Sequence, residues 1–292
     1  MVYPIGVLAA LMVGLGYVLQ QRVAATMPLS EVLHWRLLYD LMHRPLWWGG
    51  IGAMVVGQVL SGYAFQLASV GLVEPLTSTS LLFALVFSSL LSRIKIKWTE
   101  IAGAALLSAA LGMFIFVGNP HSTSNRHAPN LPIVIAMLCV LATVGILIRV
   151  ARRKTLVIES VLLSCGAGVL YGLQDASTRG ALVSFDHGGI VHMFLNAWIY
   201  MLLAAAVIGI LLAQSAFKAA RLDYSLPPIT AVEPVVGILL GVTLLGDKLT
   251  VSPLGLSLEC VCLVAMLAGV LLIARSANLA AGGAPVTPAH AS

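Results

Sequence analysis

Charged residues are scarce in this chain of 292 residues. Only 9% of its side chains belong to Asp, Glu, Lys or Arg, whereas 60% are hydrophobic. A soluble globular protein has about 25% charged residues. The composition therefore excludes a water-soluble enzyme, a disordered protein and a nucleic-acid-binding domain. The net charge of +5 is interpreted first as a signal of membrane orientation, because basic residues favour the cytoplasmic side of a membrane protein.

Sequence motifs of catalysis and metal binding are missing as well. The seven histidines form no HExxH pattern, and no P-loop of the form GxxxxGK[ST] occurs. The four cysteines lie in apolar runs without a CxxC pair, which is typical of packing residues rather than of a disulfide framework. We therefore expect no enzyme and no cofactor, and the sequence identifies no metal ligands. A membrane-embedded enzyme is kept as an alternative because such enzymes can be equally hydrophobic.

Long apolar stretches are abundant instead, and each can cross the roughly 30 Å of hydrocarbon in a bilayer. In hydrocarbon the backbone must satisfy its own hydrogen bonds, so these stretches are expected to be helices. The sequence thus predicts an all-α polytopic membrane protein with about nine transmembrane helices. The predicted spans are 4–21, 46–68, 72–91, 98–118, 131–148, 159–177, 189–213, 224–245 and 251–274.

Three further segments are too polar or too short to span. Residues 28–45 place several leucines on one helical face beside Glu31, Arg36 and Asp40, which predicts an amphipathic helix in the membrane interface; a polar loop is the alternative. Residues 119–130 form a polar hinge rich in Asn, Ser and Pro. The tail 276–292 is rich in Ala, Gly and Pro, and we expect it to be disordered and cytoplasmic.

The basic residues segregate to alternate connections of the nine predicted helices. All but three of the 16 Lys and Arg residues fall on one side, the exceptions being Arg126, Arg179 and Lys248. Because basic residues favour the cytoplasm, we expect a multi-pass protein of the cell membrane with its N-terminus outside and its C-terminus inside.

The two halves of the chain resemble each other. The first span contains Tyr17 and Gln20, and the sixth contains Tyr171 and Gln174 at the same Tyr-x-Leu-Gln spacing. In each span a glycine lies three residues before the tyrosine. We therefore expect a first repeat at 1–118, an outer loop and linking helix at 119–155, and a second repeat at 156–275. An odd offset of five helices makes the repeats inverted, a plan that places a transporter's binding site at their interface. The segments that follow Pro75 and Pro228 are similar in length, so we pair these two prolines. This pairing sets Ser80 opposite Glu233.

Four stretches of the sequence resemble the drug/metabolite transporter superfamily, especially its nine-helix branch that includes NIPA-like magnesium transporters and actinobacterial permeases. The stretches are 14–22, 45–50, 71–76 and 226–234. The resemblance implies paired four-helix repeats around a central cavity and secondary transport of amines, nucleotide sugars, amino acids or Mg²⁺. In related permeases an acidic residue stands where this chain has Ser80, which argues against a symmetric pair of carboxylates.

Ionisable side chains within a span are costly, so they usually face a cavity or a partner. Glu233 is the strongest candidate because it precedes Pro234, which frees nearby carbonyl groups. Asp175 and Gln174 come next, with Tyr171 one turn earlier. An ion pair between Asp175 and Arg179, four residues apart, is the structural alternative.

The remaining pathway candidates are neutral or lie near helix ends. Tyr17, Gln20 and Gln58 offer donors and acceptors without a fixed charge, and hydrogen bonds between helices are their alternative role. Glu259 interrupts an apolar run and is a second-rank candidate. Glu74 precedes Pro75, where a helix cap is favoured over a site.

We therefore predict a permease that works by alternating access, with ion- or proton-coupled export of an organic metabolite or drug as the preferred activity. A Mg²⁺ or divalent cation transporter is the first alternative, and a flippase for lipid-linked precursors or a membrane-embedded enzyme follows. The expected partners are a small-molecule or ion substrate and the lipid bilayer, with a homodimer left open and no nucleic acid.

Overall fold

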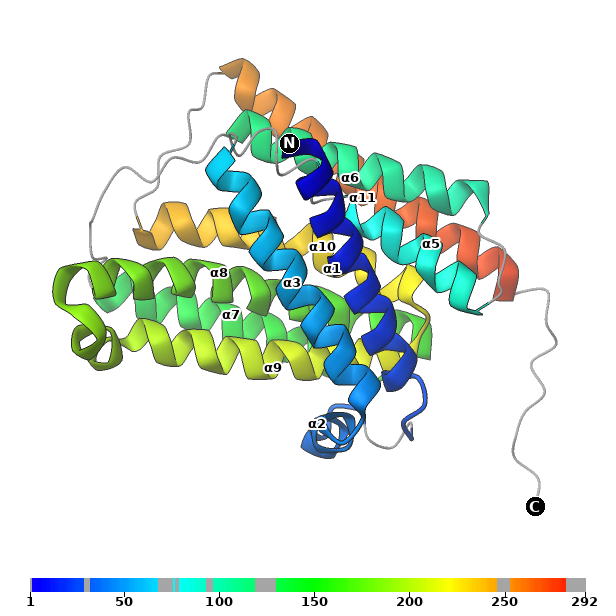
Figure 1. Cartoon of the computed structure of the whole chain (residues 1–292), viewed down its shortest axis with the longest axis horizontal. Coiled ribbons are helices and arrows are strands. Elements are labelled where there is room, and N and C mark those ends of the chain that lie inside the picture. The colour runs from blue at the N-terminus through cyan, green and yellow to red at the C-terminus, as the bar shows by residue number, and fades with distance from the viewer. Residues whose placement is uncertain are drawn as a thin grey trace.

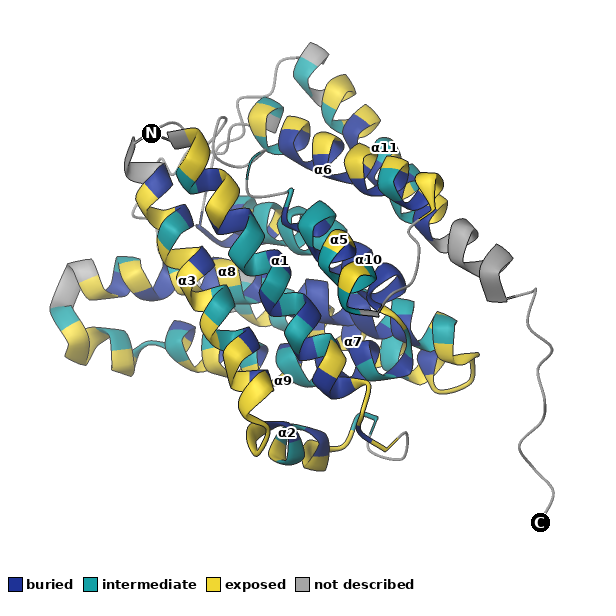
Figure 2. Cartoon of the chain, turned by 45° about the vertical axis from the view of Figure 1, so that its right-hand side comes forward, coloured by how far each residue is buried: buried dark blue, intermediate teal, exposed yellow. Residues whose placement is uncertain are grey.

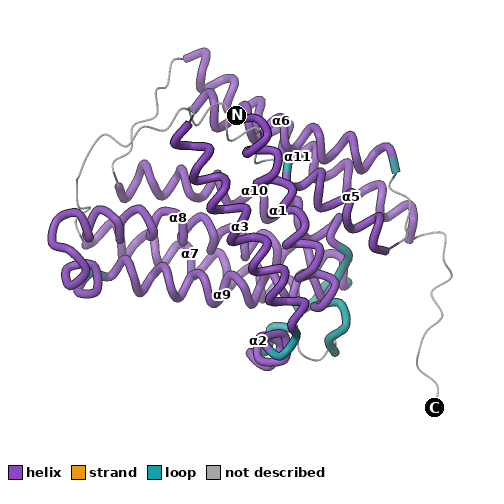
Figure 3. The backbone as a smooth tube through the Cα atoms, in the orientation of Figure 1, coloured by secondary structure: helices purple, strands orange, loops and turns teal. Residues whose placement is uncertain are grey.

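The computed structural model of the protein is a bundle of helices (Figures 1 and 3). It describes residues 2–28, 32–67, 76, 79–92, 97–118, 130–245 and 253–281, and no strand occurs within these ranges. The helices are α1 (Val2–Ala24), α2 (Trp35–Met42), α3 (Pro45–Leu67), α5 (Ser80–Ser92), α6 (Trp98–Gly118), α7 (Asn130–Ala151), α8 (Leu156–Leu195), α9 (Ala197–Ala219), α10 (Leu222–Leu240) with a π-helical end η2 (Gly241–Leu245), and α11 (Pro253–Ala281).

The helices have the length and apolar character of membrane spans. Six of them qualify by length and hydropathy among the described residues, and two shorter apolar helices lie at 80–91 and 257–273. Large apolar side chains are exposed on the outward faces of the bundle, as expected where lipid is the solvent (Figure 2). The all-α polytopic membrane class is therefore confirmed, whereas the count of nine spans stays a prediction.

Several predicted boundaries differ from the observed helices. Helix α8 continues well past residue 177, so the predicted gap before residue 189 is wrong; it changes direction at Gly189, whose φ of 68° lies in the left-handed region that glycine adopts readily. Helix α9 begins only at Ala197, where the Asn196 side chain accepts a hydrogen bond from the Ala197 amide at 3.1 Å.

Part of the segment predicted to be amphipathic is a helix, and its position in the membrane interface stays a prediction. Helix α2 covers only residues 35–42, and it buries Leu37 and Leu41 completely. It begins after Leu33, whose positive φ of 63° marks a turn.

The disorder prediction is wrong for residues 276–281. Helix α11 extends to Ala281, and four of the six residues 276–281 are Ala or Leu, which favour a helix. The hinge 119–129 and the tail 282–292 lie outside the described residues.

Helices of the two halves pack in the same way. Helix α1 packs against α3 and α5, as α8 packs against α9 and α10, and α6 packs against α11. A Cβ atom on Gly14 would lie 2.7 Å from the Ser80 carbonyl oxygen and 2.9 Å from the Ala84 nitrogen. On Gly168 it would lie 3.0 Å from the carbonyl oxygen of Ile229 and 3.3 Å from the nitrogen of Glu233.

These equivalent contacts fix the register between the halves. They match Ser80 with Ile229 and Ala84 with Glu233. The pairing of Ser80 with Glu233 from segment lengths is therefore wrong by one helical turn, because the packing against Gly14 and Gly168, rather than segment length, sets the register. Glu233 has a neutral counterpart in the first half.

A close backbone-to-backbone approach in the second half joins α8 to α10. A Cβ atom on Gly172 would lie 2.7 Å from the Glu233 carbonyl oxygen and 2.7 Å from the Gly237 nitrogen. No side chain fits between the two backbones at this point. By contrast, a Cβ atom on Gly145 of α7 would meet nothing within 4 Å.

We predict that Gly172→Ala destabilises the protein by about 1–3 kcal/mol, because the added methyl group forces two backbones apart. The matched control Gly145→Ala should keep the parent stability or raise it slightly, because it replaces glycine in an unobstructed helix. Thermal unfolding of the purified variants in detergent measures both. Equal unfolding midpoints for the two variants would contradict the observed α8–α10 contact.

Candidate functional site

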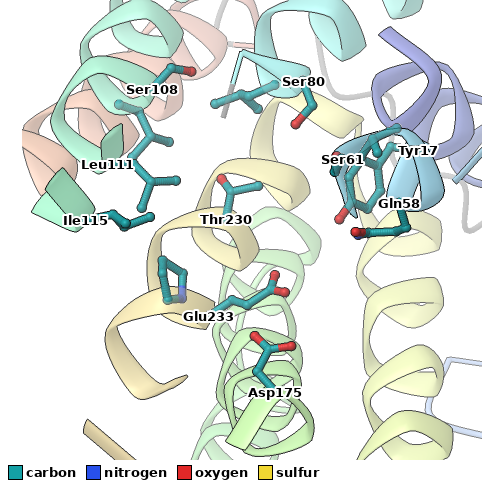
Figure 4. Close-up of a pocket in the computed structure, with 14 residues that line it drawn as sticks. Tyr17, Gln58, Ser61, Ser80, Ser108, Leu111, Ile115, Asp175, Thr230 and Glu233 are labelled. Atoms are coloured by element: carbon teal, nitrogen blue, oxygen red, sulfur yellow. The ribbon is translucent and has the colours of Figure 1, made fainter. Parts of the chain in front are cut away.

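A polar cavity of about 400 Å³ lies between the two halves of the bundle (Figure 4). Six helices contribute to its wall: α1, α3, α5, α6, α8 and α10. Its lining residues are Val13, Tyr17, Gln58, Ser61, Ser80, Leu81, Leu107, Ser108, Leu111, Ile115, Asp175, Thr230, Glu233 and Pro234. Residues far apart in sequence thus surround one space, as expected of a binding site between two repeats.

Two carboxylates lie next to each other on one side of the cavity. Asp175 comes from α8 and Glu233 from α10, and Figure 4 shows both carboxyl groups directed into the same space. The close α8–α10 contact at Gly172 brings them together, and a Cβ atom on Gly237 would lie 3.7 Å from Oδ2 of Asp175. Within a membrane such groups need water, a cation or a partner.

The backbone beside Glu233 adds an oxygen atom to this region. Pro234 has no N–H, so it cannot donate the usual helical hydrogen bond to the Thr230 carbonyl, four residues earlier. The Thr230 hydroxyl donates to the carbonyl of Pro227 at 3.0 Å. Both Thr230 and Pro234 line the cavity.

Hydroxyl and amide groups cover much of the remaining wall. Ser61 of α3, Ser80 of α5 and Ser108 of α6 are all buried, while Gln58 of α3 lies exposed in the cavity. Leucine and isoleucine side chains of α6 form an apolar patch on another part of the cavity wall. The cavity therefore presents many neutral oxygen atoms around two acidic groups, which suits a hydrated cation or a small polar solute.

The structure brings together four of the eight predicted pathway residues. Glu233, Asp175, Tyr17 and Gln58 all line the cavity. Glu74, which the sequence assigns to a helix cap, lies outside the described residues.

The other four predicted residues do not line it. Tyr171 packs on α9, where a Cβ atom on Gly209 would lie 2.8 Å from its ring, and Gln174 is half-buried nearby. Gln20 is buried and bonded to another amide, and Glu259 is half-buried on α11. The spacing of these residues along the chain could not show which of them face the cavity.

Sequence reasoning missed five polar residues near the cavity, among them Ser61 and Ser80 of its wall. Ser108 and Thr230 line it, and Gln214 lies below it. Gln214 could have been found, because an uncharged amide near the end of an apolar helix needs a hydrogen-bond partner. Serine and threonine give a weaker signal, since both bond readily to their own helix, as Thr230 does.

Metal ligation by protein side chains alone has little support. Among the described residues, no group of three or more His, Cys, Asp and Glu side chains could hold a metal ion. A cation in this cavity would therefore keep much of its water and meet the protein mainly through hydrogen bonds.

Comparison with known proteins supports a membrane transporter. The chain is 28% identical to an uncharacterized protein of Corynebacterium glutamicum over 94% of both chains. It is 25% identical to "Probable magnesium transporter NIPA9" of Arabidopsis thaliana over 91% of this chain and 79% of the relative. It is also 32% identical to "Probable magnesium transporter NIPA4" of the same plant, over 23% of this chain and 20% of the relative. No protein-family model and no solved structure matches the chain.

These similarities are weak or partial, and they support a resemblance to NIPA-type magnesium transporters only at the superfamily level. Together with the apolar helices, they support a multi-pass membrane protein that acts as a transporter.

Proposed function

We propose that the chain is a secondary transporter that carries a hydrated divalent cation of the Mg²⁺ class. The observation that carries this proposal is the meeting of Asp175 and Glu233 in one polar cavity between the two halves. Two of the similar proteins bear the name of probable magnesium transporters, which agrees with an acidic site.

The composition of the wall suits an ion that keeps its water. Mg²⁺ dehydrates reluctantly and is usually held by one or two carboxylates while it retains several water molecules. Asp175 and Glu233 supply that number of carboxylates. Ser80, Ser108 and Thr230 supply hydroxyl groups that can hydrogen-bond the water shell.

An organic solute is the second candidate cargo, and the size of the cavity favours it. Pockets for small molecules measure about 300–1,000 Å³, and this one has about 400 Å³. The ring of Tyr17 and the apolar patch on α6 would contact such a solute. The export of an organic metabolite or drug, coupled to an ion or a proton, therefore stays as the alternative.

The orientation of the bundle follows from its charges. The connections that carry most Lys and Arg residues, including Arg22, Arg44 and 149–154, lie at one end of the alternating helices, which we call the basic end. The basic end would face the cytoplasm of a cell membrane, with the N-terminus outside.

We predict that Glu233→Gln and Asp175→Asn each lower the rate of Mg²⁺ uptake at least tenfold, because each removes a negative charge that stabilises the cation. Glu259→Gln is the matched control: it neutralises a half-buried carboxylate outside the cavity and should transport like the parent. Proteoliposomes that contain a Mg²⁺-sensitive dye measure the initial rates.

Two results would contradict this assignment. Uptake at the parent rate by both cavity variants would exclude the carboxylates as the site. Transport of amines or amino acids by the parent protein, without any Mg²⁺ uptake, would favour the organic solute.

We also predict that the two ends of the chain lie on opposite sides of the membrane. A cysteine at position 3, in a variant without native cysteines, should react with a membrane-impermeant thiol reagent added to intact cells. A cysteine at Ser292 should react only after the cells are opened. Labelling of both ends from outside would contradict the odd number of spans.

A further inference from the structure

We propose that Gln20 of α1 and Gln214 of α9 form a gate that closes the cavity at the basic end, and that cargo crosses when this amide pair separates. The inference rests on the proposed transport function and adds residues that act on the pathway without lining the binding cavity. It starts from contacts between the two halves of the chain.

The amide pair joins helices that belong to different halves. Nε2 of Gln214 donates to Oε1 of Gln20 at 2.5 Å, and Nε2 of Gln20 donates to the Met54 sulfur at 2.7 Å. Gln20 is 5% exposed and Gln214 only 1%. Because Gln20 lies one turn beyond Tyr17, which lines the cavity, the pair lies directly below the cavity floor.

An aromatic contact reinforces the closure beside the amides. The rings of Tyr17 and Phe217 meet edge to face, with their centroids 6.3 Å apart and their planes at 83°. Phe217 is only 1% exposed. This contact also joins α1 to α9. The cavity is therefore bounded beside the amide pair by two packed aromatic rings.

Two more hydrogen bonds tie the same turn of α9 to the first half. Nζ of Lys218 donates to the Ala25 carbonyl at 2.9 Å, and the Leu33 amide donates to the Ser215 hydroxyl at 3.0 Å. All four ties therefore come from residues 214–218 of α9. A small shift of this single turn would break all four contacts and open the cavity at the basic end.

Burial along α10 shows where the closed part begins. Every residue from Leu222 to Ile229 is buried, whereas residues 230–238 are all partly exposed. Glu233 lies in the second group and lines the cavity. The cavity therefore ends about one turn below Glu233, on the side of the basic end.

The opposite end lacks the equivalent contact. Helices α1 and α9 pack together, but α8 and α3, their counterparts in the other half, share no comparable packing over residues 156–195 and 45–67. Gln174, which corresponds to Gln20 in the repeat, is half-buried, and Asp175 is exposed in the cavity. The conformation is thus closed at the basic end, with α3 and α8 apart at the other.

The amide pair is suited to opening because it is incompletely satisfied. Oε1 of Gln214 is buried and has no hydrogen-bond partner. An unpaired buried acceptor is unfavourable, whereas separation of the helices would expose this oxygen to water. Met54 sulfur is also a weak acceptor for Gln20.

Thiol labelling tests the gate without any transported cargo. In a variant without native cysteines, Ser108→Cys places a reporter in the cavity wall. Inside-out vesicles and sealed spheroplasts expose the two ends separately to a membrane-impermeant maleimide. Adding Gln20→Ala and Gln214→Ala together should raise the labelling rate from the basic end at least fivefold. The matched control Gln174→Ala should produce no such rise.

A cross-link provides a second arm in case the alanine variants fold poorly. Oxidation of a Gln20→Cys/Gln214→Cys protein should form a disulfide that stops transport, and a reducing agent should restore it. Unchanged labelling in a folded double-alanine variant, or full transport with a verified cross-link, would overturn the gate. A labelling increase in a protein that takes up no Mg²⁺ would instead support the gate and reject the proposed cargo.

Discussion

The direct backbone contact of α8 with α10 at Gly172 is the constraint on which the site depends. Two helices that approach this closely leave no room for a side chain between them. Asp175 follows Gly172 by three residues on α8, and Glu233 belongs to the contact itself on α10, so both carboxylates lie at the same space. In a membrane, close helix packing through small residues is available where hydrophobic burial is not. A packing feature thus determines the position of the charge.

The charge is distributed unequally between the halves. Both cavity carboxylates belong to the second half, and the register of the repeat places Ala84 where the second half has Glu233. The first half contributes neutral groups, among them Tyr17, Gln58 and Ser80. The two halves can therefore share the helix packing that movement requires, while the second half alone supplies the acidic groups for binding. The amide pair at the basic end belongs to the shared framework, since each half supplies one glutamine.

The sequence predicted the class of fold well because hydrophobicity and charge placement act directly on membrane helices. The glycine that precedes the shared Tyr-x-Leu-Gln motif in each half, Gly14 or Gly168, lies at a close helix contact. Half of the predicted site residues line the cavity. The rest failed for geometric reasons: neighbouring positions of one helix, such as Gln174 and Asp175, point in different directions, and the Tyr171 ring packs against Gly209 of α9.

The proposed function requires that the acidic cavity bind a cation between Asp175 and Glu233. Anomalous diffraction from crystals grown with Mn²⁺, which prefers the same oxygen ligands as Mg²⁺, can locate this cation. We expect an anomalous peak in the cavity beside both carboxylates. A cavity without any such peak, or a peak only elsewhere in the protein, would rule out this cation site.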